Sequence, residues 1–233
     1  MTSPGHRPPG AGAAAAPSAA HPDEVAALGE AARALGLAPA DAELARLLAY
    51  RDLIARWNRV YNLTAVRGPA DMRVQHLHDS LSVVGPLRRH TGGRAVRLLD
   101  VGSGAGLPGV VLAISCPEVD VHCVDTVAKK ADFIRQVALT LKLPNLHAHH
   151  ARVEALEAGA FDVITSRAFA SLADFVALTR GLLAEGGVWM ALKGVRPQAE
   201  IDALQGIDVF HVEPLAVPGL EAQRCLVWMR PAG

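Results

Sequence analysis

The sequence predicts an α/β protein built on a mostly parallel, seven-stranded sheet with helices on both faces. From residue 94 onward, short apolar runs alternate with stretches whose apolar residues recur at helical spacing. The last two runs are joined only by residues 213–223, which contain Pro and Gly, so we expect these strands to pair antiparallel. The first run is followed by glycines within residues 102–109, a strand–turn–helix pattern typical of a nucleotide-binding crevice.

Each strand of this sheet is expected from a short apolar run. The expected strands are 96–101, 119–124, 145–150, 161–165, 187–193, 207–213 and 224–230. Between them, residues 127–141 and 172–183 carry apolar side chains at helical spacing.

The chain divides into three expected parts. Residues 1–22 are mostly Ala, Pro and Gly and lack large apolar groups, so we expect a disordered tail; Pro17 interrupts its apolar run, which excludes a signal peptide. Residues 23–93 are expected to form a helical addition, with Asp23 as the N-cap of a helix that ends near Gly36 and with a second helix from Asp41. Residues 94–233 form the α/β domain.

Composition limits the possible partners. The formal net charge is +0, so contact with nucleic acid requires a local basic patch. The 3 cysteines form no C-x-x-C pair, which indicates reduced thiols in a cytoplasmic protein. No apolar run is long enough to span a bilayer, and no obligate protein partner is evident.

Two cofactors compete for the glycine-rich turn. Residues 104–109 read as G-x-G-x-x-G, the dinucleotide fingerprint, whereas residues 100–106 read as the D-x-G-x-G-x-G of methyltransferases that use S-adenosylmethionine. Asp100 favours the second interpretation, because a fixed carboxylate repels a pyrophosphate and attracts an ammonium or sulfonium group. We expect Asp100 and the turn residues to bind S-adenosylmethionine: Gly102, Gly104, Gly106.

Two further acids follow later strands. Asp125 comes after the second strand, where a carboxylate can accept both ribose hydroxyls; a simple helix N-cap is the alternative. Val153 and Glu154 follow the third strand, at the place where backbone groups can read the adenine edge; the alternative is an ordinary helix start.

The fourth strand should end beside the transferable methyl group. No Asn/Asp-Pro-Pro-aromatic motif and no Pro-Cys pair is present there, so neither amine methylation nor pyrimidine C5 methylation is indicated. Arg167 and Phe169 stand there instead, and they are the expected catalytic residues: Arg167 to hold a guanine edge or a phosphate, Phe169 to stack on an extruded base. The alternatives are that Arg167 pairs only with Asp162 or Asp174 and that Phe169 is a core residue.

Basic residues are concentrated near the second helix. They form either a phosphate-binding surface or a solvated helix face, and charge alone does not separate the two: Arg51, Arg56, Arg59, Arg67 and Arg73. His147, His149 and His150 suggest a metal, but no Cys or carboxylate cluster accompanies them in the sequence, so we expect polar surface positions and no metal.

The chain resembles the ribosomal small-subunit methyltransferase G family, also called glucose-inhibited division protein B. The resemblance covers roughly residues 41–230 and depends on the following motifs: Trp57-Asn58 with Asn62-Leu-Thr64, His76 with Asp79-Ser80, the turn 100–109, Arg152-Val-Glu154, the segment 166–172 and Ala191-Leu-Lys-Gly194. Gln75 stands where the family often has Arg, and the N-terminal tail has no family counterpart.

This resemblance implies a class I methyltransferase fold with a helical N-terminal addition. It also implies methyl transfer from S-adenosylmethionine to N7 of a guanine in the 530 loop of 16S rRNA, either free or in a small-subunit assembly particle. Family cofactor contacts carry over to Gly102, Leu107, Val153, Glu154 and Arg167, and phosphate contacts are expected at Lys129, Lys130, Lys193 and Arg196.

Three other functions remain as alternatives: a methyltransferase for another RNA or a small molecule, an NAD-dependent oxidoreductase, and an RNA-binding module without activity. Asp100 and the short final hairpin argue against the oxidoreductase. The intact Asp100 and Asp125 argue against an inactive module.

Overall fold

The computed structural model describes residues 22–167, 169 and 171–233. The tail expected over residues 1–22 therefore lies outside the described residues, except for Pro22, where the first helix begins. In the described part of the chain, no helix combines the length and the apolar character needed to cross a membrane.

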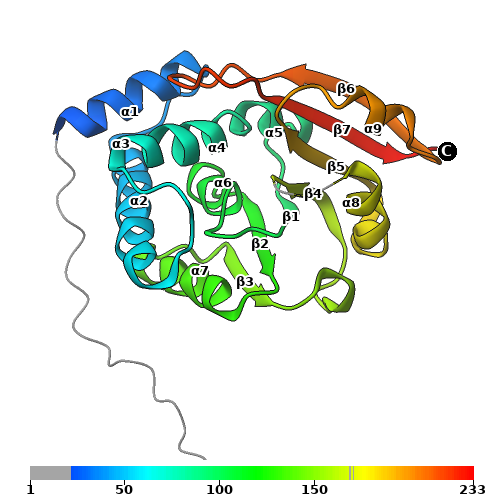
Figure 1. Ribbon diagram of the computed structural model, residues 1–233, viewed down its shortest axis with the longest axis horizontal. Coiled ribbons are helices and arrows are strands. Elements are labelled where there is room, and N and C mark those ends of the chain that lie inside the picture. The colour runs from blue at the N-terminus through cyan, green and yellow to red at the C-terminus, as the bar shows by residue number, and fades with distance from the viewer. Residues whose placement is uncertain (1–21, 168, 170) are drawn as a thin grey trace, which may run out of the picture.

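Seven strands form one sheet in the order β3-β2-β1-β4-β5-β7-β6 (Figure 1). The strands are β1 (Val96–Val101), β2 (Val119–Asp125), β3 (Leu146–His150), β4 (Phe161–Ser166), β5 (Leu183–Lys193), β6 (Ile207–Pro214) and β7 (Cys225–Pro231). Neighbouring strands from β3 to β5 are parallel, and β7 runs antiparallel to both β5 and β6. The predicted α/β class with an antiparallel final strand is confirmed.

Helices of the N-terminal region pack beside the sheet (Figure 1). They are α1 (Pro22–Ala34), α2 (Asp41–Tyr61), α3 (Pro69–Met72), the π-helical turn η1 (Arg73–His78), α4 (Asp79–Leu81) and α5 (Val84–Thr91). The α/β domain contributes α6 (Gly109–Ser115), α7 (Ala128–Leu141), the 3₁₀ turn η2 (Val153–Ala155), α8 (Leu172–Thr179), the 3₁₀ turn η3 (Arg180–Leu182) and α9 (Gln198–Asp202).

Two element boundaries differ from the sequence prediction. Helix α1 begins at Pro22, so Asp23 lies in the first helical turn, where its charge favours the helix dipole, and is not the N-cap. Strand β5 begins at Leu183, four residues before the expected start. Its first residues pair irregularly with β4, and Gly186 has φ +73, so the segment looks like a turn in sequence although it continues the strand.

Successive side chains of a strand point to opposite faces of the sheet, so there are two apolar cores, one on each face. Leu98 and Val121 point to the face covered by α2, α6 and α7, and they pack in one cluster with Ile54 of α2. Leu99 and Ile164 point to the other face and pack with Phe175 of α8. The N-terminal helices therefore complete the core on the first face and form one structural body with the α/β domain.

Asp100 joins the end of β1 to the start of α6. Its carboxylate is 0% exposed, and Oδ2 accepts a hydrogen bond of 2.8 Å from the backbone N–H of Gly109. A Cβ at position 109 would lie 2.5 Å from Cys123 Sγ and 2.8 Å from Asp100 Oδ2, so only glycine permits this approach. The phenol of Tyr50, on α2, donates to Ala105 O at 2.7 Å and ties the same turn to the N-terminal helices.

Burial also changes the protonation of Asp100. It raises the pKa of this carboxyl to about 7, although the Gly109 N–H and the charge of Arg167 act in the opposite direction. Asp100 Oδ1 has no hydrogen-bond partner among the described residues.

We predict that Gly109→Ala lowers the free energy of unfolding by about 1–3 kcal/mol, because the added methyl group overpacks the contact with Asp100 and Cys123. Gly85→Ala is the matched control, since a Cβ there meets only Arg89 Nη1 at an ordinary 3.5 Å. Urea unfolding of both variants tests this prediction. Equal stabilities would contradict it.

We predict that Asp100→Asn removes a pH dependence of stability. Because the folded pKa of Asp100 is raised, the folded protein holds a proton that the unfolded chain loses above pH about 4, so stability falls from there to about pH 7. Asparagine does not titrate, so the variant does not lose stability in this way. The difference in free energy of unfolding, variant minus wild type, should therefore rise by about 3 kcal/mol between pH 5 and pH 8. Urea unfolding across this range measures it, and parallel pH curves would rule it out.

Candidate active site

The larger of two cavities at the carboxyl end of the sheet has a volume of about 650 Å³. Its walls come from the ends of β1 and β2, from the segment 151–154, and from Phe169 and Leu178. This volume falls within the range of ligand pockets, about 300–1,000 Å³. Gly102, Asp125, Val153 and Glu154, all expected to bind the cofactor, are brought together in this cavity.

Asp125 shapes the floor of this cavity. Its Oδ2 accepts the N–H of Gly104 at 3.0 Å, and its Oδ1 accepts the N–H of Val127 at 2.9 Å. Each carboxylate oxygen has a second lone pair, so Asp125 can hold the loop and also accept a ligand hydroxyl. Lys130 Nζ lies 3.6 Å from Asp125 and lines the same cavity, which places Lys130 beside the cofactor cavity and not on an outer RNA surface.

The charge of the cavity distinguishes between the two cofactors. Three carboxylates line it, those of Asp125, Glu154 and Asp174, against two cations, Lys130 and Arg152. Such a cavity has no surplus positive charge for a pyrophosphate, and it suits a ligand that carries an ammonium and a sulfonium group. The donor set therefore fits S-adenosylmethionine.

Among the other predicted cofactor residues, Arg167 lines a second cavity, and the rest lie behind the wall of the first. Asp100 and Leu107 are buried beneath the turn, and neither lines the cavity. Gly104 and Gly106 act through their backbones, since Gly104 donates to Asp125 and the carbonyl of Gly106 lies 3.2 Å from the Tyr50 hydroxyl.

A second cavity, of about 390 Å³, lies between the N-terminal region and the end of β4. It is polar: Arg167, Lys193 and Arg224 supply three cations to its wall, and Asp79 supplies the carboxylate. Thr64, Gln75 and His76 complete the polar lining. The excess of positive charge suits an anionic ligand such as a nucleotide phosphate.

Asp79 organises this second cavity. Its side chain is 2% exposed, and its two oxygens bind two guanidinium groups: Arg167 Nη1 lies 3.2 Å from Oδ2, and Arg224 Nε lies 2.8 Å from Oδ1. Arg167 Nη1 also donates to the carbonyl of Gln75, in the π-helical turn, at 3.2 Å. The alternatives that paired Arg167 with Asp162 or Asp174 are wrong, since these acids accept from Arg97 N–H and from Ser171.

His76 lies beside this ion cluster. Its Nε2 is 3.0 Å from Thr64 Oγ1, and its Nδ1 has no partner among the described residues. Burial, followed by the charge of Arg167, lowers the pKa of His76, so the imidazole is neutral at neutral pH.

Phe169 belongs to the larger cavity. Its ring lies against Phe175, with centroids 5.3 Å apart, and it forms part of the cavity wall. Phe169 also packs against the core on this face of the sheet, and its expected stacking on an extruded base stays a prediction. Ser166, just before this segment, donates from Oγ to the carbonyl of Val101 at 2.9 Å, which fixes the segment against β1.

The predicted RNA-binding residues separate into two groups. Arg51 is 5% exposed and pairs with Glu24 at 2.5 Å and Asp52 at 2.7 Å, so its expected role as an RNA contact is wrong. Lys193 has a side chain only 14% exposed and binds Glu200 at 2.9 Å, so it belongs to the second cavity and not to an outer surface.

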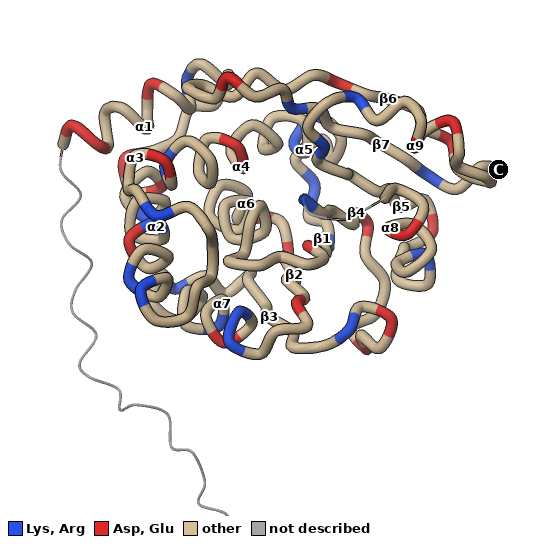
Figure 2. The backbone as a smooth tube through the Cα atoms, in the orientation of Figure 1, with Lys and Arg blue, Asp and Glu red and all other residues tan. Residues whose placement is uncertain are grey.

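The other basic residues of the prediction reach the surface. Arg56 and Arg59 are exposed on α2, and Lys129 is exposed at the start of α7. Figure 2 shows basic positions along α2 and at α7, two helices that pack against each other. Arg73 is half-buried, whereas Arg196 is exposed after β5 and bonds Gln198 at 2.9 Å.

Sequence reasoning did not assign Asp79 and Arg224 to the site. Asp79 had a signal, since it stands with His76 and Ser80 among the motifs that carry the family resemblance. No feature of the sequence pointed to Arg224, because it lies 145 residues from Asp79 in the chain.

Solved structures with low sequence identity share this fold. TrmN from Thermus thermophilus superposes with a TM-score of 0.54 at 21% identity, covering 75% of this chain and 53% of that one. A point mutant of MtNAS in complex with S-adenosylmethionine gives a TM-score of 0.56 at 14% identity, covering 84% of this chain and 80% of that one. These likenesses show that the chain shares their fold.

Sequence comparison gives the family. The chain is 64% identical over 201 residues to ribosomal RNA small subunit methyltransferase G of Leptothrix cholodnii, covering 86% of this chain and 92% of the relative. It is 61% identical over 207 residues to the protein of the same name from Methylibium petroleiphilum, covering 88% and 94%. The family model described as rRNA small subunit methyltransferase G matches residues 43–227. The chain therefore belongs to the rRNA small subunit methyltransferase G family.

Proposed function

We propose that the protein methylates N7 of a guanine in the 530 loop of 16S rRNA, with S-adenosylmethionine as the methyl donor. The observation that carries this proposal is the position of one short segment between two cavities. Phe169 lines the larger cavity, which has the charge for S-adenosylmethionine, and Arg167 lines the cationic one. A donor in the first cavity and a nucleotide in the second would meet at this segment.

The first cavity holds the donor in this proposal. Asp125 accepts the ribose hydroxyls, and the backbone of Val153 and Glu154 contacts the adenine. S-adenosylmethionine supplies an electrophilic methyl group on a sulfonium. The buried Asp100 accepts the N–H of Gly109 and thereby fixes the backbone on which the methionine part lies.

The second cavity holds the acceptor. The guanidinium of Arg167 presents a planar pair of donors to the O6 edge of guanine or to a phosphate, and Asp79 fixes its orientation. Arg224 and Lys193 neutralise the RNA backbone. Exposed basic residues on α2 and α7 extend this positive surface: Arg56, Arg59 and Lys129.

Methylation at N7 fits the absence of a free carboxylate base in the described lining of the second cavity. Its one carboxylate, Asp79, is held by two guanidinium groups. Guanine N7 carries an exposed lone pair, so no proton has to leave before it attacks the methyl group. The site therefore acts by positioning the two reactants in line and by excluding water.

The family assignment argues against a small-molecule acceptor and against an NAD-dependent reaction. The three-cation cavity supports a polyanionic acceptor, and the carboxylates of the larger cavity disfavour a pyrophosphate. The acceptor we propose is 16S rRNA, either free or within a small-subunit assembly particle.

The cofactor assignment predicts tight binding of S-adenosylmethionine or S-adenosylhomocysteine and no binding of NAD. Asp125→Asn should weaken binding of S-adenosylhomocysteine by roughly tenfold or more, the loss of a charged hydrogen bond. Asp162→Asn is the matched control, because Asp162 also accepts a backbone N–H but lies outside both cavities. Calorimetry tests both variants; NAD binding of similar strength, or an unchanged Asp125 variant, would contradict the assignment.

The acceptor assignment predicts N7-methylguanine as the product on 16S rRNA. Arg167→Ala should lower the single-turnover rate by about a hundredfold, because it removes charged hydrogen bonds at the reacting base. Arg180→Ala, an exposed arginine outside both cavities, should leave the rate unchanged.

Borohydride treatment followed by aniline cleavage converts N7-methylguanine into a strand break, which locates the product. Incorporation of labelled methyl groups without such a break would mean that another atom is methylated. An Arg167→Ala variant as fast as the Arg180→Ala variant would remove Arg167 from the site.

A further inference from the structure

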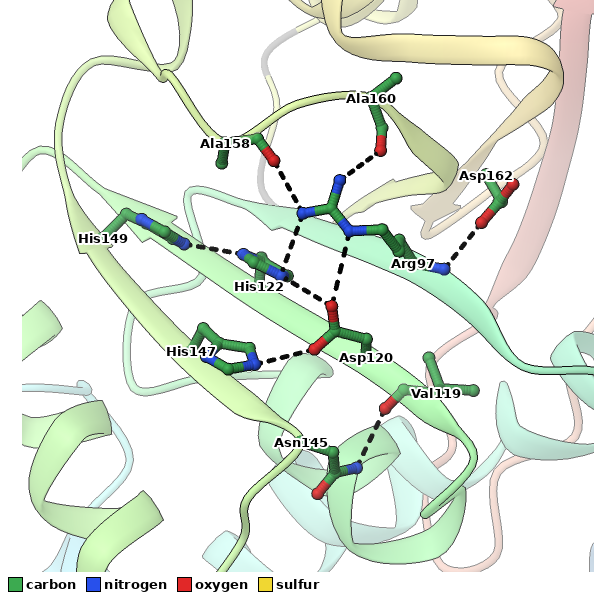
Figure 3. A network of polar contacts seen from close by, with 10 residues as sticks. All are labelled: Arg97, Val119, Asp120, His122, Asn145, His147, His149, Ala158, Ala160 and Asp162. Carbon is green, nitrogen blue, oxygen red and sulfur yellow. Dashed lines mark hydrogen bonds and ion pairs between the residues drawn. The ribbon is translucent and has the colours of Figure 1, made fainter.

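A polar cluster lies on one face of β2 and β3, near the amino ends of these strands (Figure 3). Asp120 and His122 belong to β2, and His147 is directly opposite His122 on β3. Along β2, Asp120 and His122 are five and three residues from Asp125, or about 16 and 10 Å at 3.3 Å per residue. It is therefore separate from both cavities of the active site.

Three side chains of this cluster converge. One potential ligand atom from each of Asp120, His122 and His147 lies within 4.8 Å of the others. His147 Nε2 is 2.8 Å from Asp120 Oδ1, and His122 Nε2 is 3.1 Å from Asp120 Oδ2. Around a tetrahedral zinc ion, ligand atoms at about 2.0–2.1 Å from the metal lie roughly 3.3 Å apart. The two observed separations are both slightly shorter than this value, so side-chain rotations that move the ligand atoms apart would admit an ion.

His122 is the central side chain. With its hydrogen on Nε2, the neutral imidazole donates to Asp120 and accepts from His149 at Nδ1, and only the contact with Arg97 is left without a hydrogen-bond acceptor. Nδ1 lies 2.9 Å from His149 Nε2, while Nε2 faces both the carboxylate of Asp120 and Arg97 Nη2, at 3.3 Å. A hydrogen on Nε2 satisfies Asp120 and opposes Arg97. A hydrogen on Nδ1 satisfies His149 and leaves the Nε2 lone pair facing the carboxylate.

A cation between His122 Nε2 and the Asp120 carboxylate would take the place of the hydrogen bond between these two groups. His122 then donates from Nδ1 to His149, the outer contact by which a metal-bound histidine is usually oriented. Asn145 donates to the carbonyl of Val119 at 3.0 Å and holds the starts of the two strands together.

Arg97 is the opposing charge, and it sets the strength of the site. Its guanidinium donates to the carbonyls of Ala158 and Ala160 at 2.7 Å and 2.6 Å, and its Nε lies 3.5 Å from Asp120 Oδ2. These two carbonyls accept the shortest hydrogen bonds of Arg97, so Arg97 does not need His122 as an acceptor. Its positive charge makes the site weaker than a structural site with four protein ligands.

We propose that Asp120, His122 and His147 bind a divalent transition-metal ion of the zinc class. Two imidazole nitrogens and one carboxylate oxygen are donors that zinc accepts, and water fills the fourth position. The ion would tie the edge strand β3 to β2 and stabilise this edge of the sheet, independently of methyl transfer.

Titration of the tag-free, metal-stripped protein with Zn²⁺ by calorimetry, and with Co²⁺ by visible absorption, tests this proposal. We expect one equivalent of saturable binding, the visible bands of tetrahedral Co²⁺, and a higher melting temperature with Zn²⁺. His147→Ala and Asp120→Asn should each weaken binding by at least about tenfold. His150→Ala is the matched control, because His150 is exposed on the same strand and bonds Thr126 O outside the cluster.

Binding retained in the His150→Ala variant but lost in the His147→Ala variant supports the site. Absence of saturable binding in the wild type, or equal binding in the His147→Ala variant, would overturn it. Calorimetric binding of S-adenosylhomocysteine by each variant verifies that the variant is folded.

Discussion

The contact between the Asp100 carboxylate and the N–H of Gly109 fixes the geometry on which the rest of the site depends. It holds the end of β1 against the start of α6 without room for a side chain at position 109. The turn between these elements then lies over Asp100, where Asp125 binds it from β2 and Tyr50 binds it from α2. Burying Asp100 raises its pKa, so stability is given up here for a fixed turn.

A second buried carboxylate plays a comparable part on the other side of β4. Asp79 is held by Arg167 and Arg224, which come from distant parts of the chain, and it thereby joins the N-terminal helices to the ends of β4 and β7. Removing one partner of such a group leaves an uncompensated buried charge, so the three side chains should be considered as one unit. The N-terminal helices are thus part of the proposed acceptor site as well as of the core.

The fold was predictable because each element has a local signal. Apolar runs marked the strands, helical spacing marked α7 and α8, and the short link after β6 implied the antiparallel strand. The irregular start of β5 was missed, since Gly186 resembles a turn in sequence. The cofactor side of the site was also accessible, because Asp125, Val153 and Glu154 each follow a strand and parallel strands end at one edge of the sheet.

The acceptor side was less accessible, because it depends on pairings between residues far apart in the chain. The partner of Arg167 is 88 residues away and that of Arg224 is 145 residues away. Arg51 shows the same limit: its charge suggested a phosphate contact, but Glu24, 27 residues earlier, binds it in the interior. Likewise, the histidines of β3 have neighbours that became evident only once Asp120 and His122 were placed beside them.

The central claim is that donor and acceptor occupy two cavities that meet at Arg167 and Phe169. A crystal structure of the protein with S-adenosylhomocysteine tests it most directly. The account places the adenosyl group in the larger cavity, with the ribose at Asp125 and the sulfur directed past Phe169 toward Arg167. An adenosyl group bound elsewhere, or a sulfur directed away from Arg167, would contradict the account.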